Sequence, residues 1–303
     1  MTTSSPEPYW LGRASDEQKR LLKQHTIWTR IHTPPLPPLH PTTHLTLPRS
    51  IGYLLHPTVS AALPENARIA DIGTGTGIWP IEMSQASPPG HKIHGFDISA
   101  EQFPPAASLP PNVTLGYGDF KAPFPTELHG TFDLVNIRLI IISLGPEAAW
   151  KAVLDNVLAL LKPRGALCWT EGDFLVARAF RGMAQMATPG HHLTRGQVQL
   201  NSTLVRRFGY SFPSLSTLFE DAGLRDVEED VLSTDRLPEQ RGAFTELGIG
   251  AVFGGLKNLA KVEGEGYWDE EEVERRRALA VADKESGAYL RWDIHVGVGF
   301  KAE

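Results

Sequence analysis

From residue 67 onward, short apolar runs alternate with segments that carry apolar residues at three- and four-residue spacing. The apolar runs are typical of buried strands and the spaced segments of amphipathic helices. Strands alternating with helices imply a mainly parallel, doubly wound α/β sheet with right-handed crossovers. The pattern predicts strands at 67–72, 91–96, 113–117, 132–136 and 166–170, and helices at 78–85 and 147–161.

The alternation is interrupted after residue 171 and resumes later. We expect helices at 174–186 and 196–208 joined by a loop at 188–192, then a helix at 214–222 and a strand at 226–233. We also expect helices at 239–262 and 269–287. A last strand at 290–300 brings the number of expected strands to seven. The extra segments, at about 174–213 and 236–288, are predicted to form a helical cap over the ligand crevice at the end of the sheet.

The first 65 residues have a different character. Residues 15–28 have a helical pattern, and eight prolines fall between residues 31 and 64. We expect an N-terminal helical arm and a proline-stiffened connector with a short helix near 50–55, followed by one domain over 66–303. The arm is either a lid over a site or a packed linker, and the pattern alone leaves both open.

Composition narrows the class of protein. The 303 residues are 41% apolar with a formal charge of −6 and one cysteine, Cys168. An acidic chain without a basic block is a poor partner for nucleic acid or anionic membranes. It has no signal-peptide pattern and no apolar run of membrane-spanning length, and it lacks metal-ligand clusters. We therefore expect a cytoplasmic globular protein without a metal ion, with Cys168 packed inside a strand.

The strongest chemical signal is the segment from Asp71 to Gly77, which reads Asp-Ile-Gly-Thr-Gly-Thr-Gly between a predicted strand and a predicted helix. Alternate glycines allow a tight turn and close approach of the backbone to a ligand. The spacing fits neither a dinucleotide fingerprint nor a P-loop, because Ile78 and Pro80 stand where a third glycine would be needed and Ile78 replaces the P-loop lysine.

Two acids end the next strands. Asp97 lies about 20 residues beyond the glycine loop, where a carboxylate can accept both hydroxyls of a ribose. Asp119 ends the following strand and could accept from an adenine amine while Phe120 packs against the ring. Asp119 alone could equally be a turn cap, so the three features count together.

This set resembles the class I S-adenosylmethionine-dependent methyltransferases. Similar family features are Phe132-Asp133-Leu134-Val135 and the turn from Leu160 to Gly165, where Arg164 replaces a glycine. The resemblance implies a Rossmann-like fold and S-adenosyl-L-methionine as cofactor. The residues it assigns to cofactor binding are Asp71, Gly73, Thr74, Gly75, Gly77, Asp97, Ile98, Asp119, Phe120 and Asn136.

Gly-Thr-Gly-Thr-Gly-Ile-Trp is similar to the fungal secondary-metabolism branch, which includes LaeA-like proteins. The N-terminal pattern Tyr9-x-Leu-Gly-Arg13, followed by Arg20-Leu-x-x-Gln-His25-x-x-Trp28, resembles the branch with the gliotoxin-pathway dithiol S-methyltransferase. This resemblance favours a lid, with Tyr9 and Arg13 near the methionine end of the cofactor.

Several residues are weaker candidates. Arg138, expected just after the fourth strand, would contact the cofactor carboxylate or the substrate, or form a surface ion pair. His191 and His192, in the expected loop, are candidate general bases or solvated residues. His25 is a candidate structural residue that holds the arm, and Glu171 is expected either to face the pocket or to pair with an arginine.

The function implied is in-line methyl transfer to an O, N or S nucleophile of a small secondary metabolite. The first alternative is a methyltransferase-like pericyclase or cyclase that uses the same pocket without methyl transfer. The second is a non-enzymatic, LaeA-like regulator.

Overall fold

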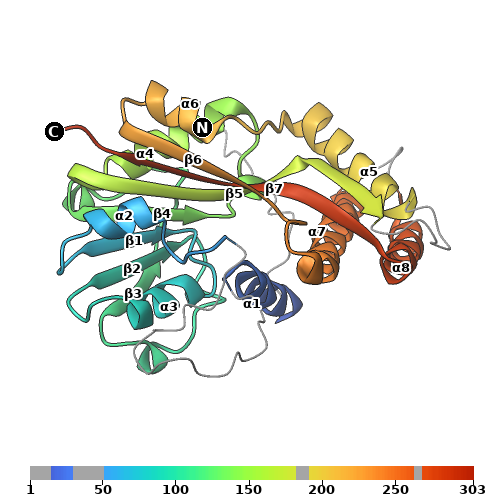
Figure 1. Ribbon diagram of the computed structural model, residues 1–303, viewed down its shortest axis with the longest axis horizontal. Helices are drawn as coiled ribbons and strands as arrows, with labels where there is room; N and C mark the ends of the chain where they lie inside the picture. The colour runs from blue at the N-terminus through green and yellow to red at the C-terminus, as the bar shows by residue number, and fades with distance from the viewer. Residues whose placement is uncertain (1–14, 30–50, 182–190, 263–267) are drawn as a thin grey trace.

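A seven-stranded sheet runs through the computed structural model, which describes residues 15–29, 51–181, 191–262 and 268–303 (Figure 1). The strand order is β3-β2-β1-β4-β5-β7-β6. The first five strands are parallel to one another. They are β1 (Arg68–Ile72), β2 (Lys92–Asp97), β3 (Val113–Tyr117), β4 (Phe132–Arg138) and β5 (Leu161–Arg181).

The last two strands make the sheet mixed. β7 (Ala288–Phe300) lies between β5 and β6 (Arg225–Ser233) and is antiparallel to both. Beyond the end of β4, β5 continues as a ribbon with β7, in which Arg178 pairs with Arg291 and Arg181 with Ala288. The expected α/β sheet of seven mainly parallel strands is confirmed.

Both faces of the central parallel strands β1 and β4 are largely buried, which explains their apolar runs. Neighbouring residues alternate between two cores: Ile69 and Leu134 belong to one, Ala70 and Val135 to the other. The first core is covered by α1 (Ser15–Thr29), α2 (Pro57–Ala62) and α3 (Ile78–Ala86), and the second by α4 (Glu147–Leu158) and α6 (Leu215–Asp221). Short 3-10 turns are η1 (Ala106–Ser108), η2 (Thr126–Leu128), η3 (Ile141–Ser143) and η4 (Pro238–Gln240).

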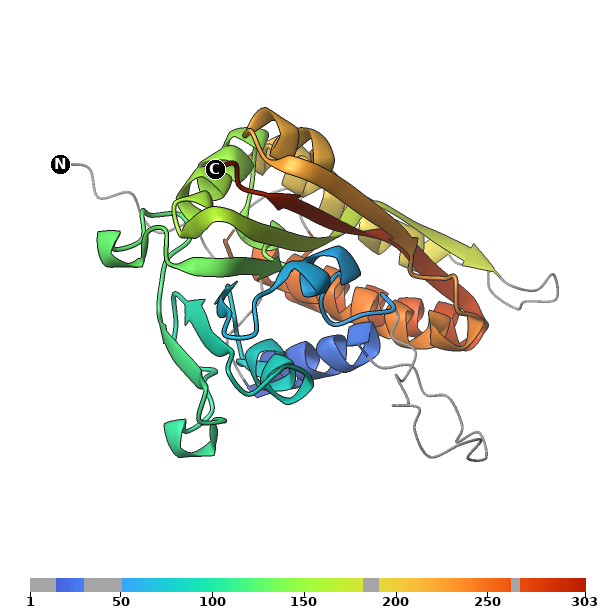
Figure 2. The ribbon, with the colours of Figure 1, turned by 60° about the vertical axis from the view of Figure 1, so that its left-hand side comes forward.

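Three further helices pack together beside the β5–β7 ribbon (Figures 1 and 2). They are α5 (His191–Phe208), α7 (Arg241–Val262) and α8 (Glu270–Glu285). The arm helix α1 contacts both α3 and α7, so it connects the helices that cover the sheet to this second group of helices. The division of the chain into an arm, a domain and caps stays a prediction.

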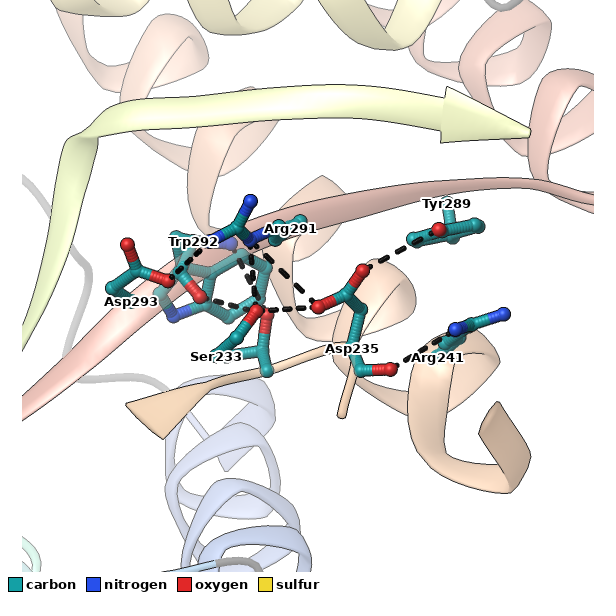
Figure 3. A network of polar contacts seen from close by, with 8 residues as sticks. Ser233, Asp235, Arg241, Tyr289, Arg291, Trp292 and Asp293 are labelled. Carbon is teal, nitrogen blue, oxygen red and sulfur yellow. Dashed lines mark hydrogen bonds and ion pairs between the residues drawn. The ribbon is translucent and has the colours of Figure 1, made fainter. Parts of the chain in front are cut away.

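A polar network fixes the ribbon to the turn between β6 and α7 (Figure 3). The Arg291 Nε donates to Ser233 Oγ at 2.8 Å, and Tyr289 donates its hydroxyl to Asp235 at 3.4 Å. Arg241 Nε donates to the backbone carbonyl of Asp235 at 3.1 Å, and its guanidinium lies 4.7 Å from the Tyr289 ring centroid.

Three local predictions are wrong. Of the helix expected at 174–186, the described residues 174–181 are strand, because β5 continues to Arg181 and pairs there with β7. The short helix expected near 50–55 is replaced by bends, and α2 begins at Pro57, a residue suited to a first helical turn. The loop expected at 188–192 ends early, since α5 already begins at His191.

Two boundaries also shift. The helix expected to reach residue 161 ends at Leu158 because Leu161 pairs with Phe132. Arg138 is the last residue of β4 instead of following it. Within the described ranges, no helix has the length and apolar character needed to cross a membrane.

Candidate functional site

The site predicted from the sequence lies where the sheet order reverses. β1 has β2 on one side and β4 on the other, so the connections after β1 and β4 lead to opposite directions along the sheet. Such a topological switch point leaves a crevice at the carboxyl ends of the strands, where α/β proteins bind ligands. Asp71 and Asn136 are directly paired across β1 and β4 at this edge.

The glycine loop after β1 depends on the absence of side chains. Gly73, Gly75 and Gly77 have φ angles of 68°, 56° and 69°. A Cβ on Gly73 would lie 2.7 Å from Ile140 Cγ2, and a Cβ on Gly77 would lie 2.7 Å from Leu115 Cδ1. The loop therefore presents backbone at the strand edge in a conformation that larger residues would strain.

Asp97 ties the end of β2 to the glycine loop. Its carboxylate accepts from the backbone N–H of Gly75 at 2.8 Å and of Ser99 at 3.1 Å. The acid and the loop therefore lie side by side, as their separate positions at neighbouring strand ends require.

Asp71 is buried beneath the loop, with 3% of its surface exposed. Its carboxylate accepts from Thr74 Oγ1 and from Asn136 Nδ2, each at 2.7 Å. Burial raises the pKa of Asp71, while the nearby Arg138 guanidinium and these two hydrogen bonds oppose that rise. The Asp71 carboxylate thus links the loop residue Thr74 to Asn136 of β4 from beneath the loop.

Arg138 is half-buried at the end of β4. Its Nη2 lies 3.1 Å from Nδ1 of His25, a residue of α1, and its guanidinium lies 5.9 Å from the Trp79 ring centroid. Burial lowers the pKa of Arg138, and the carboxylates of Asp71 and Glu82 oppose this. Within the described part of the chain, its buried Nε has no hydrogen-bond partner.

The third strand-end acid lies in a turn. Asp119 is half-buried and accepts from the backbone N–H of Lys121 at 2.9 Å, as a turn cap does. Phe120 faces the glycine loop, with its Cε1 3.9 Å from the Cβ position of Gly73. Ile98 is 49% exposed beside Asp97.

The two candidate bases lie elsewhere. His191 and His192 begin α5, where the backbone N–H of His192 donates to Asp283 of α8 at 2.8 Å. The α5 helix follows the tip of β5 at Arg181, which is about 35 Å along the strand from Thr170, the neighbour of Arg138. The structure does not bring the histidines to the glycine loop, and Tyr9 and Arg13 lie outside the described residues.

Within the described residues, the partners of the Glu171 carboxylate are N–H groups and not an arginine. Glu171 is fully buried and accepts from the backbone N–H of Ile140 at 2.8 Å and of Ile141 at 3.3 Å, and from Trp169 Nε1 at 3.0 Å. It thereby holds the turn that follows β4, in which Leu139 has a φ of 58°.

Two residues that pack around the site, Ile140 and Glu82, were not predicted from the sequence. Ile140 packs on Gly73 but stands in an apolar run that carries no polar marker. Glu82, whose carboxylate lies 2.5 Å from His25 Nε2, is an ordinary helix-surface residue in the sequence. Only the predicted register of α3 on the sheet could have pointed to it.

The arrangement suits an organic ligand. Among the described residues, no group of three or more His, Cys, Asp or Glu side chains could hold a metal ion. The glycines give space for close backbone approach, Asp97 places a carboxylate beside them, and Arg138 places a half-buried guanidinium at the end of β4. These residues fit a nucleoside that also carries an amino-acid group.

The sheet order, the glycine loop at its switch point and the strand-end acids together define a class I methyltransferase fold. The family match agrees. A family model described as "Methyltransferase domain" matches residues 47–229, which is more than half of the chain. The chain belongs to this family of S-adenosylmethionine-binding methyltransferases.

The chain is similar to fungal proteins of secondary metabolism. It is 29% identical to the N-methyltransferase tcpN of Claviceps purpurea over 180 residues, 59% of this chain and 62% of that protein. It is 30% identical to methyltransferase grgD of a Penicillium species, covering 57% and 56%. It is 31% identical to the secondary metabolism regulator LAE1 of Pyricularia oryzae, covering 35% and 32%. The chain thus matches about three fifths or less of each relative's length.

Proposed function

We propose that the chain transfers a methyl group from S-adenosylmethionine to an O, N or S nucleophile of a small secondary metabolite. The observation that carries the proposal is the glycine loop held by Asp97 at the switch point of the sheet. The similarity to tcpN and grgD, both named methyltransferases, supports it.

In this proposal the strand-end residues bind the nucleoside. Asp97 accepts the ribose hydroxyls, Asp119 accepts the adenine amine, and Phe120 and Ile98 pack against the ring. Gly73, Thr74, Gly75 and Gly77 let the backbone approach, with Asp71 and Asn136 beneath them. A bound S-adenosylmethionine supplies an activated methyl group on a sulfonium.

The remaining residues orient the cofactor and exclude water. Arg138 binds the carboxylate at the amino-acid end, and Tyr9 and Arg13 belong to the same end. Methyl transfer depends on in-line alignment of the nucleophile and on a dry site, since little acid–base chemistry is needed. We assign no general base, because His191 and His192 lie near the tip of the β5–β7 ribbon.

Titration calorimetry with S-adenosylmethionine and its demethylated product, S-adenosylhomocysteine, tests cofactor binding. We expect binding to the wild type and a loss of about 10- to 100-fold for Asp97→Ala, because hydrogen bonds to a charged group are strong. Glu101→Ala, a nearby exposed acid, is the matched control and should keep wild-type affinity. No binding to the wild type at about 100 μM would contradict the proposal.

Product mass tests the reaction. Incubation with pathway intermediates should raise the mass of one intermediate by one methylene unit. An isomerised product of unchanged mass would instead indicate a cyclase.

The similarity to LAE1 favours a second candidate, a regulator of secondary metabolism. A stable complex with other proteins, combined with no turnover of any intermediate, would support the regulator and contradict the enzyme.

A further inference from the structure

The arm helix α1 reaches the proposed cofactor site through one side chain. His25 is buried, with 8% of its surface exposed. Its Nε2 lies 2.5 Å from Glu82 Oε2 on α3, and its Nδ1 lies 3.1 Å from Arg138 Nη2 at the end of β4. The imidazole therefore bridges three elements that are distant in the sequence.

The two partners determine the tautomer of His25. A guanidinium only donates hydrogen bonds, so the Nδ1 that faces Arg138 must accept. An ionised carboxylate only accepts, so the Nε2 that faces Glu82 must carry the hydrogen. The bridge is thus a directed chain: Arg138 donates to His25, and His25 donates to Glu82.

This chain restricts the orientation of Arg138. A guanidinium is a planar fork, so fixing Nη2 and packing the group near the Trp79 ring leave few orientations for its other nitrogens. The Nε is buried and has no partner within the described residues. A buried cationic donor without a partner is costly unless a ligand or another group pairs with it.

We propose that His25 is a positioning residue that orients Arg138 toward the carboxylate of the cofactor's amino-acid end. The arm then forms part of the cofactor site, although His25 itself does not touch the cofactor. This inference rests on the proposed function.

Two ligands separate this role from a general structural one. S-adenosylhomocysteine carries the carboxylate, whereas 5′-methylthioadenosine shares the nucleoside and sulfur but lacks the amino-acid end. In titration calorimetry, His25→Ala should weaken S-adenosylhomocysteine about tenfold or more and leave 5′-methylthioadenosine within about twofold.

His25→Gln is the conservative variant. An amide has one acceptor and one donor group, so glutamine can accept from Arg138 and donate to Glu82. It should restore most of the affinity for S-adenosylhomocysteine. Lys23→Ala is the matched control, because Lys23 anchors the same helix to Glu246 of α7 at 2.6 Å without touching Arg138. It should change neither affinity.

The outcomes are distinct. Equal losses for both ligands in His25→Ala, an unchanged affinity, or an equal loss in Lys23→Ala would each overturn the positioning role. A wild type that binds neither ligand would instead overturn the proposed function. If His25→Ala does not fold, Glu82→Ala gives the same test, since it removes the acceptor that fixes the tautomer. Wild-type selectivity between the ligands in Glu82→Ala would then overturn the inference.

Discussion

Glu171 is a fully buried carboxyl group with three donors around it, two of them backbone N–H groups of the turn after β4. Burial raises its pKa to about 7, and the hydrogen bonds from Trp169, Ile140 and Ile141 only partly oppose this. Because Ile140 in turn packs on Gly73, the Glu171 carboxyl supports the glycine loop indirectly, through Ile140.

The raised pKa makes the stability depend on pH. Below the ordinary value of 4.5 the carboxyl is protonated in both states, so its contribution is fully present. As the pH rises to about 7, the unfolded chain releases the proton more readily, and the free energy of unfolding falls by about 3 kcal/mol. Glu171→Gln should remove this fall, measured by urea unfolding at several pH values between 4.5 and 7.

The comparison is between profiles, because other acids also titrate in this range. Glu101→Gln, at an exposed position, should keep the wild-type slope. Parallel profiles for the wild type and Glu171→Gln would show that Glu171 titrates equally in both states.

At the scale of elements, the glycine loop is held by two separate restraints, a left-handed backbone and a lack of space. Gly77 has both, whereas Gly130 has a similar φ of 62° with nothing within 4 Å of its Cβ position. Gly130→Ala should cost about 1–2 kcal/mol of unfolding free energy from backbone strain alone. Gly77→Ala should cost about 1–3 kcal/mol more from overpacking against Leu115, measured by chemical denaturation.

Trimming the neighbour provides the check. Leu115→Ala in the Gly77→Ala background should cost less than it does in the wild type, since it relieves the contact. Equal costs in both backgrounds would mean that Leu115 does not limit the loop.

The parallel half of the sheet was predictable from the sequence because strands buried on both faces produce continuous apolar runs. Residues 174–181 were not, because their extended conformation depends on pairing with β7, which comes about a hundred residues later. The glycine loop and Asp97 could be predicted from their spacing in the sequence. The bridge from His25 to Arg138 does not, since it exists only after three elements have packed.

At the scale of the molecule, Trp28 fixes α1 in the core. Trp28 is 1% exposed and belongs to the same core as Ile69 and Trp79. We expect Trp28→Ala to lower the unfolding free energy by about 3–5 kcal/mol, as for other buried aromatic residues.

Leu22→Ala on the same helix is the control. Leu22 is 39% exposed, so its replacement should cost about 0.5 kcal/mol or less in the same denaturation experiment. Similar small costs for both variants would mean that α1 is a separable lid and contributes little to global stability.

The arm's contacts also have a consequence for the order of folding. Lys23 meets Glu246, which lies 223 positions later, and Tyr53 meets Asp230, which lies 177 positions later. During synthesis α1 leaves the ribosome long before α7 exists, so the contact of Lys23 with Glu246 cannot form until α7 has been made. Such non-local closure is slow. The α1 helix, although made early, is therefore expected to be among the last elements to dock, and its docking would report that α7 has been made.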